Sequence, residues 1–290
     1  MDGSEKHERH EEEHIHRNTL HDPQQHQHHQ PQQQQGMHPS FLRVLEQRKR
    51  IKERLKSIKH KIGVYSAKGG VGKTTIAMNL AYTLSKKGFK VGLLDADVDC
   101  PNITMFLGIE GAKIDNHAPL MPVEHMGVKV ISTGMLVDEL KKPIIWRGPL
   151  VTKMLGDFFE YTDWGELDYL IVDLSPGLSD GPLTIMQLLD LDGFVLVTTP
   201  ERVSSLNATR SGRMAKKLNM AVLGMVENMS AGKPSASTLE AAKELGTEVI
   251  GTVDRTQAIA SATDSGKIQV MEYDNIAAEF DRIAERLIGR

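Results

Sequence analysis

Cysteine is nearly missing from this sequence, which has a single one, Cys100, among 290 residues. One thiol cannot form an intramolecular disulfide, and no Cys-x-x-Cys pair is present for a zinc or redox site. We interpret Cys100 as a buried and chemically inert side chain, since free cysteine packs as a small apolar residue.

Long apolar runs are also missing. No stretch approaches the roughly 18 to 20 apolar residues that spanning a bilayer requires. The polar N-terminus lacks the apolar segment of a signal peptide, so we expect a cytoplasmic protein. The net charge of -3 argues against broad nucleic-acid binding, and the 40% of apolar and 25% of charged residues are ordinary for a soluble globular protein.

Residues 1–38 contain few apolar residues but nine of the twelve histidines and many glutamines. Such a segment cannot bury enough apolar surface to offset the entropy lost on ordering, so we predict a disordered tail. Imidazole nitrogens also ligate Zn2+, Ni2+ or Cu2+. The tail is therefore either a loose metal-binding segment or an inert one, while irregular spacing argues against a closed structural metal site.

Residues 39–60 are expected to form a basic amphipathic helix. Six apolar residues recur at helical spacing, namely Phe41, Val44, Leu45, Ile51, Leu55 and Ile58. The other face is basic, with Arg43, Arg48, Lys49, Arg50, Lys52, Arg54, Lys56 and Lys59. This helix either docks on the main domain with a solvated basic face, or contacts an anionic membrane or a partner.

From residue 61 to residue 290, short apolar runs alternate with helical patterns. The expected strands are residues 61–66, 90–95, 128–132, 169–173, 194–198, 222–226 and 249–253. The expected helices are residues 74–87, 150–161, 182–191, 204–218, 235–245 and 275–287. Continuous apolar strands that alternate with helices are typical of a buried parallel sheet. We predict one α/β domain with a mostly parallel central sheet and helices on both faces.

A glycine-rich loop follows the first expected strand. Residues 67–74 fit the Walker A pattern G-x-x-x-x-G-K-[ST], with Ala67 in place of the first glycine. Glycines let backbone N–H groups close around phosphate oxygens, and the following helix adds its N-terminal dipole. The predicted nucleotide-binding residues are Lys68, Gly69, Gly70, Val71, Gly72, Lys73, Thr74 and Thr75. We expect Lys73 to reach the β- and γ-phosphates of ATP and the Thr74 hydroxyl to ligate Mg2+.

Two aspartates end expected strands close to this loop. Asp173 closes the Walker B pattern Tyr-Leu-Ile-Val-Asp, and we expect it to hold Mg2+ through water because Mg2+ dehydrates reluctantly. Asp97 follows the strand that ends in Leu-Leu-Asp, which places it near the γ-phosphate. Residues 174–177, Leu-Ser-Pro-Gly, are expected to form a loop that senses the γ-phosphate.

The run Lys-Gly-Gly-Val-Gly-Lys-Thr-Thr resembles the deviant Walker A of the group that contains the nitrogenase iron protein, MinD and ParA. This resemblance implies homodimers in which Lys68 reaches the phosphates across the interface, much as an arginine finger does. It also assigns Asp97 to orienting the attacking water. The expected catalytic residues are therefore Lys68 and Asp97.

Further stretches resemble one branch of this group, the Mrp/ApbC-type ATPases, which carry iron–sulfur clusters. They are Asp-Ala-Asp and Cys-Pro-Asn-Ile within 95–103, Trp-Arg-Gly-Pro at 146–149, Trp-Gly-Glu-Leu-Asp-Tyr at 164–169, Asp-Leu-Ser-Pro-Gly-Leu-Ser-Asp-Gly at 173–181, Thr-Thr-Pro-Glu at 198–201 and Gly-Met-Val-Glu-Asn-Met-Ser at 224–230. The resemblance implies that Asn228 contacts the adenine, and a carboxamide offers both a donor and an acceptor to a purine edge.

One departure from that family concerns the cluster. In the family a Cys-x-x-Cys pair follows Val-Glu-Asn-Met-Ser within several residues, whereas this chain continues Ala-Gly-Lys-Pro-Ser at 231–235. An all-cysteine [4Fe–4S] cluster needs four thiolates, and a homodimer of this chain has two. ATP binding is thus predicted from the residues themselves, and cluster binding from the resemblance alone.

These features predict a P-loop ATPase domain at residues 61–290 that slowly hydrolyses ATP to ADP and phosphate. By resemblance it acts in iron–sulfur cluster or metal-cofactor assembly, with a client protein that receives the cofactor. The alternative is a MinD- or ParA-like positioning protein, switched by ATP, that binds membrane or nucleic acid through its basic helix. A third alternative is a regulatory or scaffold relative that binds ATP without needing turnover.

Overall fold

The computed structural model describes residues 39–288, except 99, 113–118, 136–147, 178–181, 183, 184, 187, 258, 260, 261, 263 and 264. Three features expected from the sequence fall outside these residues: the tail at 1–38, the Trp-Arg pair at 146–147 and the Leu-Ser-Asp-Gly segment at 178–181. The helix expected at 182–191 lies partly outside them.

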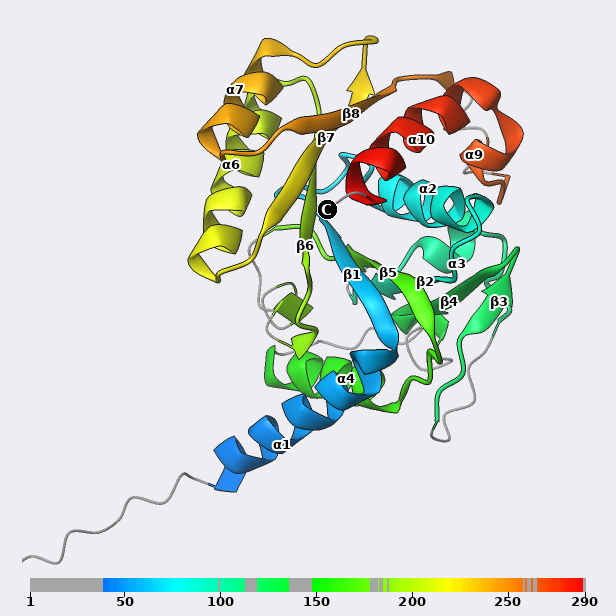
Figure 1. Cartoon of the computed structure of the whole chain (residues 1–290), viewed down its shortest axis with the longest axis vertical. Helices are drawn as coiled ribbons and strands as arrows, with labels where there is room; N and C mark the ends of the chain where they lie inside the picture. The colour runs from blue at the N-terminus through cyan, green and yellow to red at the C-terminus, as the bar shows by residue number, and fades with distance from the viewer. Residues whose placement is uncertain are drawn as a thin grey trace, which may run out of the picture. The chain divides into compact units, whose positions relative to one another are not determined.

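The centre of the domain is an eight-stranded sheet with the strand order β3-β4-β2-β5-β1-β6-β7-β8 (Figure 1). The strands are β1 (Ile58–Tyr65), β2 (Val91–Ala96), β3 (Val123–His125), β4 (Val128–Ser132), β5 (Leu167–Leu174), β6 (Gly193–Thr198), β7 (Val222–Ser230) and β8 (Val249–Asp254). Neighbouring strands pair in parallel, except that the edge strand β3 is antiparallel to β4. The predicted mostly parallel α/β sheet is confirmed.

Helices cover both faces of this sheet (Figure 1). Helices α2 (Lys73–Lys86), α9 (Gln269–Glu272) and α10 (Asp274–Ile288) gather on one face, and α6 (Arg202–Lys217) and α7 (Ala236–Glu244) on the other. The described helices also include α1 (Pro39–Arg54), α3 (Ile103–Phe106) and α4 (Gly148–Tyr161). Helix α10 illustrates the packing: Ile276, Phe280, Ile283 and Leu287 recur at helical spacing and are all buried.

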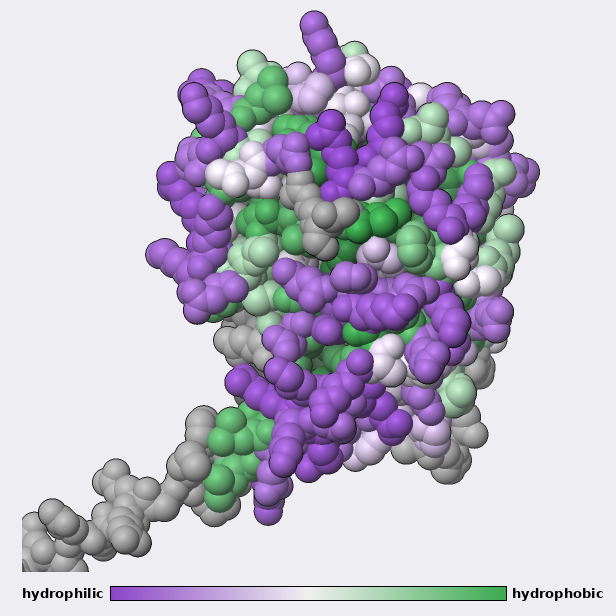
Figure 2. Space-filling view, viewed as in Figure 1, coloured by the Kyte–Doolittle hydropathy of each residue, from purple (hydrophilic) through white to green (hydrophobic). Residues whose placement is uncertain are grey.

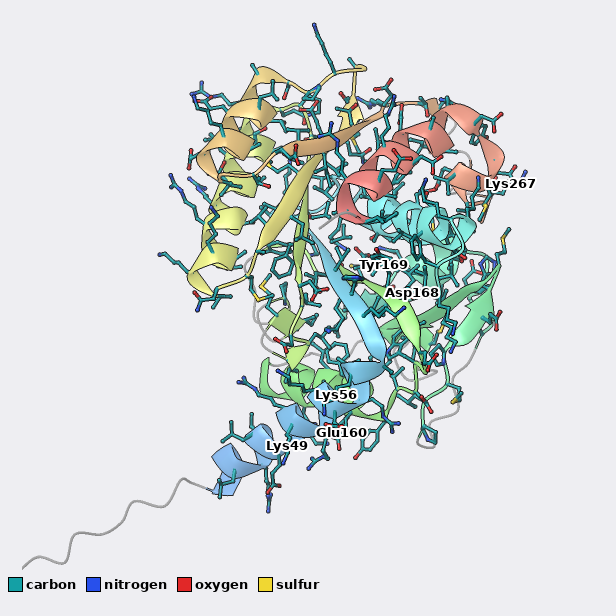
Figure 3. All side chains as sticks on the ribbon, in the orientation of Figure 1. Lys49, Lys56, Glu160, Asp168, Tyr169 and Lys267 are labelled. Atoms are coloured by element: carbon teal, nitrogen blue, oxygen red, sulfur yellow. The ribbon has the colours of Figure 1, made fainter. Side chains whose placement is uncertain are left out.

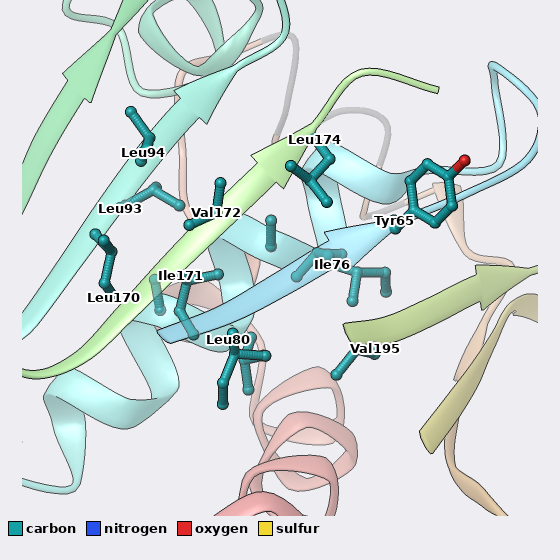
Figure 4. Close-up of a cluster of buried hydrophobic side chains, with 14 of the residues drawn as sticks. Tyr65, Ile76, Leu80, Leu93, Leu94, Leu170, Ile171, Val172, Leu174 and Val195 are labelled. Carbon is teal, nitrogen blue, oxygen red and sulfur yellow. The ribbon is translucent and has the colours of Figure 1, made fainter. Parts of the chain in front are cut away.

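The apolar core lies where the central strands meet helix α2 (Figure 4). Leu93 of β2, Ile171 of β5 and Ile76 of α2 have no exposed surface. Because both faces of the central strands are covered, the buried parts of these strands are mostly apolar. Buried polar side chains gather at the carboxyl ends of the strands, among them those of Asp95 and Asp173.

The first strand begins earlier than the sequence predicted. Helix α1 ends at Arg54 instead of residue 60, a short 3-10 turn spans Leu55–Ser57, and β1 starts at Ile58. Ile58 is buried and pairs with Leu167 of β5, so strand pairing takes the residues that helical spacing had assigned to the helix. The expected list of strands and helices did not include β3 and α3, which are short and have no clear apolar repeat.

Helix α1 docks through its second half. Ile51 is buried, as is Leu55 in the 3-10 turn that follows the helix, and the Gln47 amide donates to Asp157 of α4 over 3.1 Å. Arg50 forms an ion pair with Glu160 at 2.6 Å, in the region where Figure 3 labels Glu160 beside α1. In the first half, Leu42, Val44 and Leu45 are about two-fifths exposed and form an apolar patch at the end of the helix (Figure 2).

The helices in the described part of the chain are short or carry many charged residues. None of the helices there combines the length and the apolar character needed to cross a bilayer.

Candidate functional site

The glycine-rich loop connects β1 to α2 at the carboxyl edge of the sheet. Gly70 and Gly72 have φ angles of 79° and 82°, in the left-handed region that favours glycine. A Cβ atom added to Gly69 or Gly70 would meet nothing within 4 Å, so the loop is open on that side. Helix α2 starts directly after Gly72. An open loop followed by a helix N-terminus fits a phosphate group.

Lys73 and Thr74 both contact Asp173. The Lys73 ammonium forms an ion pair with one carboxylate oxygen of Asp173, and the Thr74 hydroxyl donates to the other over 2.7 Å. Lys73 and Asp173 are buried, whereas Lys68 is exposed on the loop. The sequence-predicted Mg2+ ligands, Thr74 and Asp173, are therefore in direct contact, and their oxygens are of the kind that Mg2+ prefers.

A second buried carboxylate, Asp95, lies beside Asp173. The two residues pair across the neighbouring strands β2 and β5, and neither is exposed. Burial and the charge of Asp173 raise the pKa of Asp95, and burial also raises the pKa of Asp173 although the Lys73 ammonium opposes the shift. Asp95 accepts hydrogen bonds from the Ser132 hydroxyl at 2.9 Å and from the Ile103 N–H at 3.1 Å.

Asp95 also accepts the N–H of Asp97 at 3.2 Å, so it fixes both ends of the segment between β2 and α3. Sequence reasoning missed this role of Asp95, although its place in the Asp-Ala-Asp motif was a signal.

Asp97 is nearly buried and faces the loop after β5. Its Oδ1 atom accepts hydrogen bonds from the Ser175 hydroxyl and from the Cys100 N–H, both at 3.2 Å. The next residues of that loop reach the start of the glycine-rich loop, because the Gly177 N–H donates to the Ser66 carbonyl over 3.0 Å. The structure thus joins the expected sensing loop to Asp97, a contact that no local sequence pattern indicated.

The interpretation of Cys100 as buried is wrong, because Cys100 is exposed. It lies past the end of β2 in the segment that leads to α3, and it contributes its backbone N–H to Asp97. The polar main chain of this residue faces the site, which leaves the side chain at the surface.

Asn228, near the end of β7, contacts the glycine-rich loop. Its side-chain amide donates to the Val71 carbonyl over 2.8 Å, and a Cβ atom on Gly72 would lie 2.1 Å from the amide nitrogen. The side chain is almost fully buried. Asn228 therefore supports the loop, and its contact with adenine stays a prediction.

The connection from β7 to α7 is where the sequence lacks the Cys-x-x-Cys pair. Glu227 of β7 is fully buried and joins the two ends of this connection. It accepts hydrogen bonds from the Ser230 hydroxyl at 3.1 Å, from the Ser235 N–H at 3.0 Å and from the Ser235 hydroxyl at 2.5 Å. The Gly232 N–H donates to Asp254 over 2.7 Å. No group of three or more His, Cys, Asp or Glu side chains in the described ranges could hold a metal ion. The residues of this connection do not fit an iron–sulfur cluster.

The fold and the site define a nucleotide-binding protein of the P-loop class, with a deviant Walker A loop. Residues 57–288 match the profile of the ParA family described as NUBPL iron-transfer P-loop NTPase, and the chain belongs to this family.

Curated relatives and solved structures agree with this assignment. The iron–sulfur cluster carrier protein of Methanocaldococcus jannaschii is 41% identical over 263 residues, which cover 85% of this chain and 90% of that protein. The carrier protein of Aquifex aeolicus is 37% identical over 253 residues, 81% of this chain and 69% of that protein. A nucleotide-binding protein of Archaeoglobus fulgidus, solved with ADP, is 35% identical with a TM-score of 0.67, over 78% of this chain and 94% of that one. MinD of Pyrococcus furiosus shares the fold, at 23% identity and a TM-score of 0.59, over 79% of this chain and 98% of that one.

Proposed function

We propose that this chain binds ATP with Mg2+, hydrolyses it slowly, and acts in the transfer of an iron–sulfur cluster or another metal cofactor to a client protein in the cytoplasm. The observation that carries the nucleotide part is the meeting of Lys73, Thr74 and Asp173 beside an open glycine-rich loop. Membership of an iron-transfer family supports the cargo.

Each part of the site has a place in this chemistry. The backbone N–H groups of residues 69–72 would surround the phosphates, and Lys73 would neutralise their charge. Thr74 would ligate Mg2+ directly and Asp173 through water. Bound Mg2+ supplies further positive charge to the phosphate oxygens. Asp97 would orient the attacking water, and Asn228 would contact the adenine.

Lys68 has a separate role in the proposal. Its side chain is exposed on the loop, while Lys73, the first residue of α2, is buried against Asp173. We assign Lys68 to ATP bound by a second copy of the chain, where a further positive charge would stabilise the phosphoryl transition state. The functional unit is then a homodimer.

In this proposal the iron–sulfur cluster or metal cofactor is transferred to a client protein. The chain has one cysteine, so a homodimer supplies two of the four thiolates that an all-cysteine [4Fe–4S] cluster needs. The protein that delivers or receives the cluster would supply the others. The histidine-rich segment at 1–38 is a second source of metal ligands.

The decisive experiment is metal and sulfide analysis of protein purified without oxygen, combined with an ATPase assay. Stoichiometric metal after reconstitution with iron and sulfide, or after titration with Ni2+, supports the cargo, and no stoichiometric metal in either case contradicts it. Cys100→Ser is the companion variant, because loss of metal in it assigns binding to the thiol and retained metal assigns it to histidine. A protein that does not bind ATP contradicts the nucleotide part.

A second candidate function is a MinD- or ParA-like protein that binds membrane or nucleic acid when it holds ATP. One observation favours it: the first half of α1 leaves Leu42, Val44 and Leu45 exposed on a helix rich in basic residues. It predicts ATP-dependent binding to anionic liposomes or to DNA that weakens as salt is raised. Liposome binding that is lost in the double variant Leu42→Ala, Leu45→Ala would establish it.

A further inference from the structure

The loop after β5 is held by two residues that precede the glycine-rich loop. The Gly177 N–H donates to the carbonyl of Ser66, and the Gly177 carbonyl accepts a hydrogen bond from the Tyr65 hydroxyl. Gly177 has a φ angle of 88°, so the chain turns there in the left-handed region that favours glycine. Both backbone polar groups of this residue are therefore tied to the end of β1.

The other end of the same loop holds Asp97. The Ser175 hydroxyl donates to Oδ1 of Asp97 over 3.2 Å and lies 3.4 Å from the carbonyl oxygen of Ala96. Only Pro176 separates Ser175 from Gly177, and a proline fixes its own φ angle and restricts the residue before it. A shift of Gly177 would therefore move Ser175 as well, and with it the hydrogen-bonded carboxylate of Asp97.

Tyr65 combines a buried ring with a hydroxyl that contacts this loop. It is the last residue of β1 and fully buried, its ring centre lies 6.0 Å from that of Phe194, and its hydroxyl points away from the apolar cluster (Figure 4). Burial raises the pKa of Tyr65, so the hydroxyl stays protonated and remains a hydrogen-bond donor under ordinary assay conditions. This buried hydroxyl restrains the loop through the Gly177 carbonyl.

We propose that Tyr65 is a positioning residue for ATP hydrolysis, which holds Gly177 and, through Ser175, fixes the carboxylate of Asp97. The inference rests on the proposed role of Asp97 in orienting the attacking water. The groups assigned to the phosphates are Lys73, Thr74 and the loop N–H groups, and none of them depends on the Tyr65 hydroxyl. Its loss should slow turnover and leave nucleotide binding largely intact.

The test is Tyr65→Phe, which removes the hydroxyl and keeps the ring. One hydrogen bond of this kind predicts a kcat lowered roughly three- to tenfold, with KM for ATP changed by less than about twofold. Ser175→Ala should lower kcat by a similar factor. Because both residues act through one loop, the double variant should be little slower than either single variant.

Tyr82→Phe is the matched control. Tyr82 is also fully buried, and its hydroxyl lies 2.6 Å from Nδ1 of His125 at the edge strand β3. This variant should lose stability to a similar extent as Tyr65→Phe but keep the wild-type kcat. The proposal is overturned if Tyr65→Phe keeps the wild-type kcat, or if the losses in the double variant multiply.

A wild-type protein that binds ATP without hydrolysing it would contradict the proposed function separately. The restraint on the loop would then be measured by hydrogen exchange of the Gly177 N–H, which is bonded to the Ser66 carbonyl. Faster exchange in Tyr65→Phe than in wild type supports the positioning role, and an unchanged rate of exchange overturns it.

Discussion

The Asn228 amide donates to the Val71 carbonyl over 2.8 Å, which ties the end of β7 to the glycine-rich loop. Removing a buried partner of a hydrogen bond costs about 1–3 kcal/mol, so Asn228→Ala should weaken nucleotide binding by roughly tenfold. If Asn228 also contacts adenine, the preference for ATP over GTP should shrink in this variant. Titration of wild type and variant with both nucleotides measures each effect, and an equal loss for ATP and GTP would leave Asn228 with the loop-supporting role alone.

The same contact can be probed from the loop. Gly72→Ala would place a Cβ atom 2.1 Å from the Asn228 amide nitrogen at a φ angle of 82°, so the nucleotide-free protein should be destabilised by several kcal/mol. Gly69→Ala is the control, because a Cβ atom there meets nothing within 4 Å. Denaturant unfolding without nucleotide compares the two, and equal stabilities would contradict the close contact.

The buried carboxylate of Asp95 predicts a dependence of stability on pH. Burial and the charge of Asp173 raise the pKa of Asp95 to about 7 in the folded protein, whereas the pKa in an unfolded chain is about 4. Between these values the folded state holds a proton that the unfolded state has released, so this group lowers the free energy of unfolding as pH rises from ~4 towards 7. Asp95→Asn lacks this titration and also removes a charge that raises the pKa of its neighbour. Its stability relative to wild type should therefore increase over the same range.

Asp168→Asn is the control for this measurement. A hydrogen bond from Lys59 lowers the pKa of Asp168. The stabilising effect of the Asp168 carboxylate is therefore lost only at pH values below the ordinary pKa of an aspartate. The stability of this variant relative to wild type should stay constant where that of Asp95→Asn changes. A difference between wild type and Asp95→Asn that does not vary with pH would refute the shifted pKa.

Much of this fold could be predicted because buried parallel strands have a strong local pattern. The run Leu-Asp-Tyr-Leu-Ile-Val-Asp-Leu of β5 is covered on both faces, so its apolar character is visible in the sequence. The strand β3 was missed because Val123–His125 is only partly buried and three residues long. The start of β1 was misplaced because Ile58 fits a helical repeat as well as a strand.

The candidate site likewise has parts that the sequence predicted and parts that it did not. The glycine-rich loop and Asp173 follow from spacing alone, since phosphate binding needs those residue types in that order. The contacts of Tyr65 with Gly177 and of Asn228 with Val71 join residues 112 and 157 positions apart, and no local pattern records such pairs. The exposure of Cys100 was wrongly predicted for the same reason, because it depends on which face of the segment turns towards Asp97.

Helix α1 and the 3-10 turn that follows it offer a test of docking by two leucines. Leu55 is 3% exposed against the domain, whereas Leu45 is 40% exposed in the first half of the helix. Leu55→Ala should lower the free energy of unfolding by about 2–5 kcal/mol, and Leu45→Ala should change it by less than about 0.5 kcal/mol. Urea denaturation of both variants measures these changes. Similar losses in the two variants would mean that the first half of α1 is covered in solution, for example by a partner.

Lys68 lies on the glycine-rich loop and Lys73 at the start of α2, and alanine substitutions at the two positions should have different effects. Lys73 is paired with the buried Asp173, so Lys73→Ala should abolish nucleotide binding and also destabilise the protein by about 3–5 kcal/mol, because it leaves an unpaired buried charge. Lys68 is exposed, so Lys68→Ala should keep stability and ATP affinity within about twofold of wild type while lowering kcat by about 10³-fold, the effect of losing a charge that acts only in the transition state.

Lys217→Ala, at an exposed lysine on the last turn of α6, controls for the loss of a surface charge and should behave as wild type. ATPase rates and ATP titrations of the three variants separate binding from turnover. Mixing the Lys68→Ala and Lys73→Ala proteins then tests directly whether Lys68 acts on ATP bound by the other subunit. Each mixed dimer has one intact nucleotide site, on the Lys68→Ala subunit, faced by the intact Lys68 of the other subunit. Activity restored by mixing supports the action of Lys68 across the interface, whereas a Lys68→Ala protein as fast as wild type would remove Lys68 from the mechanism.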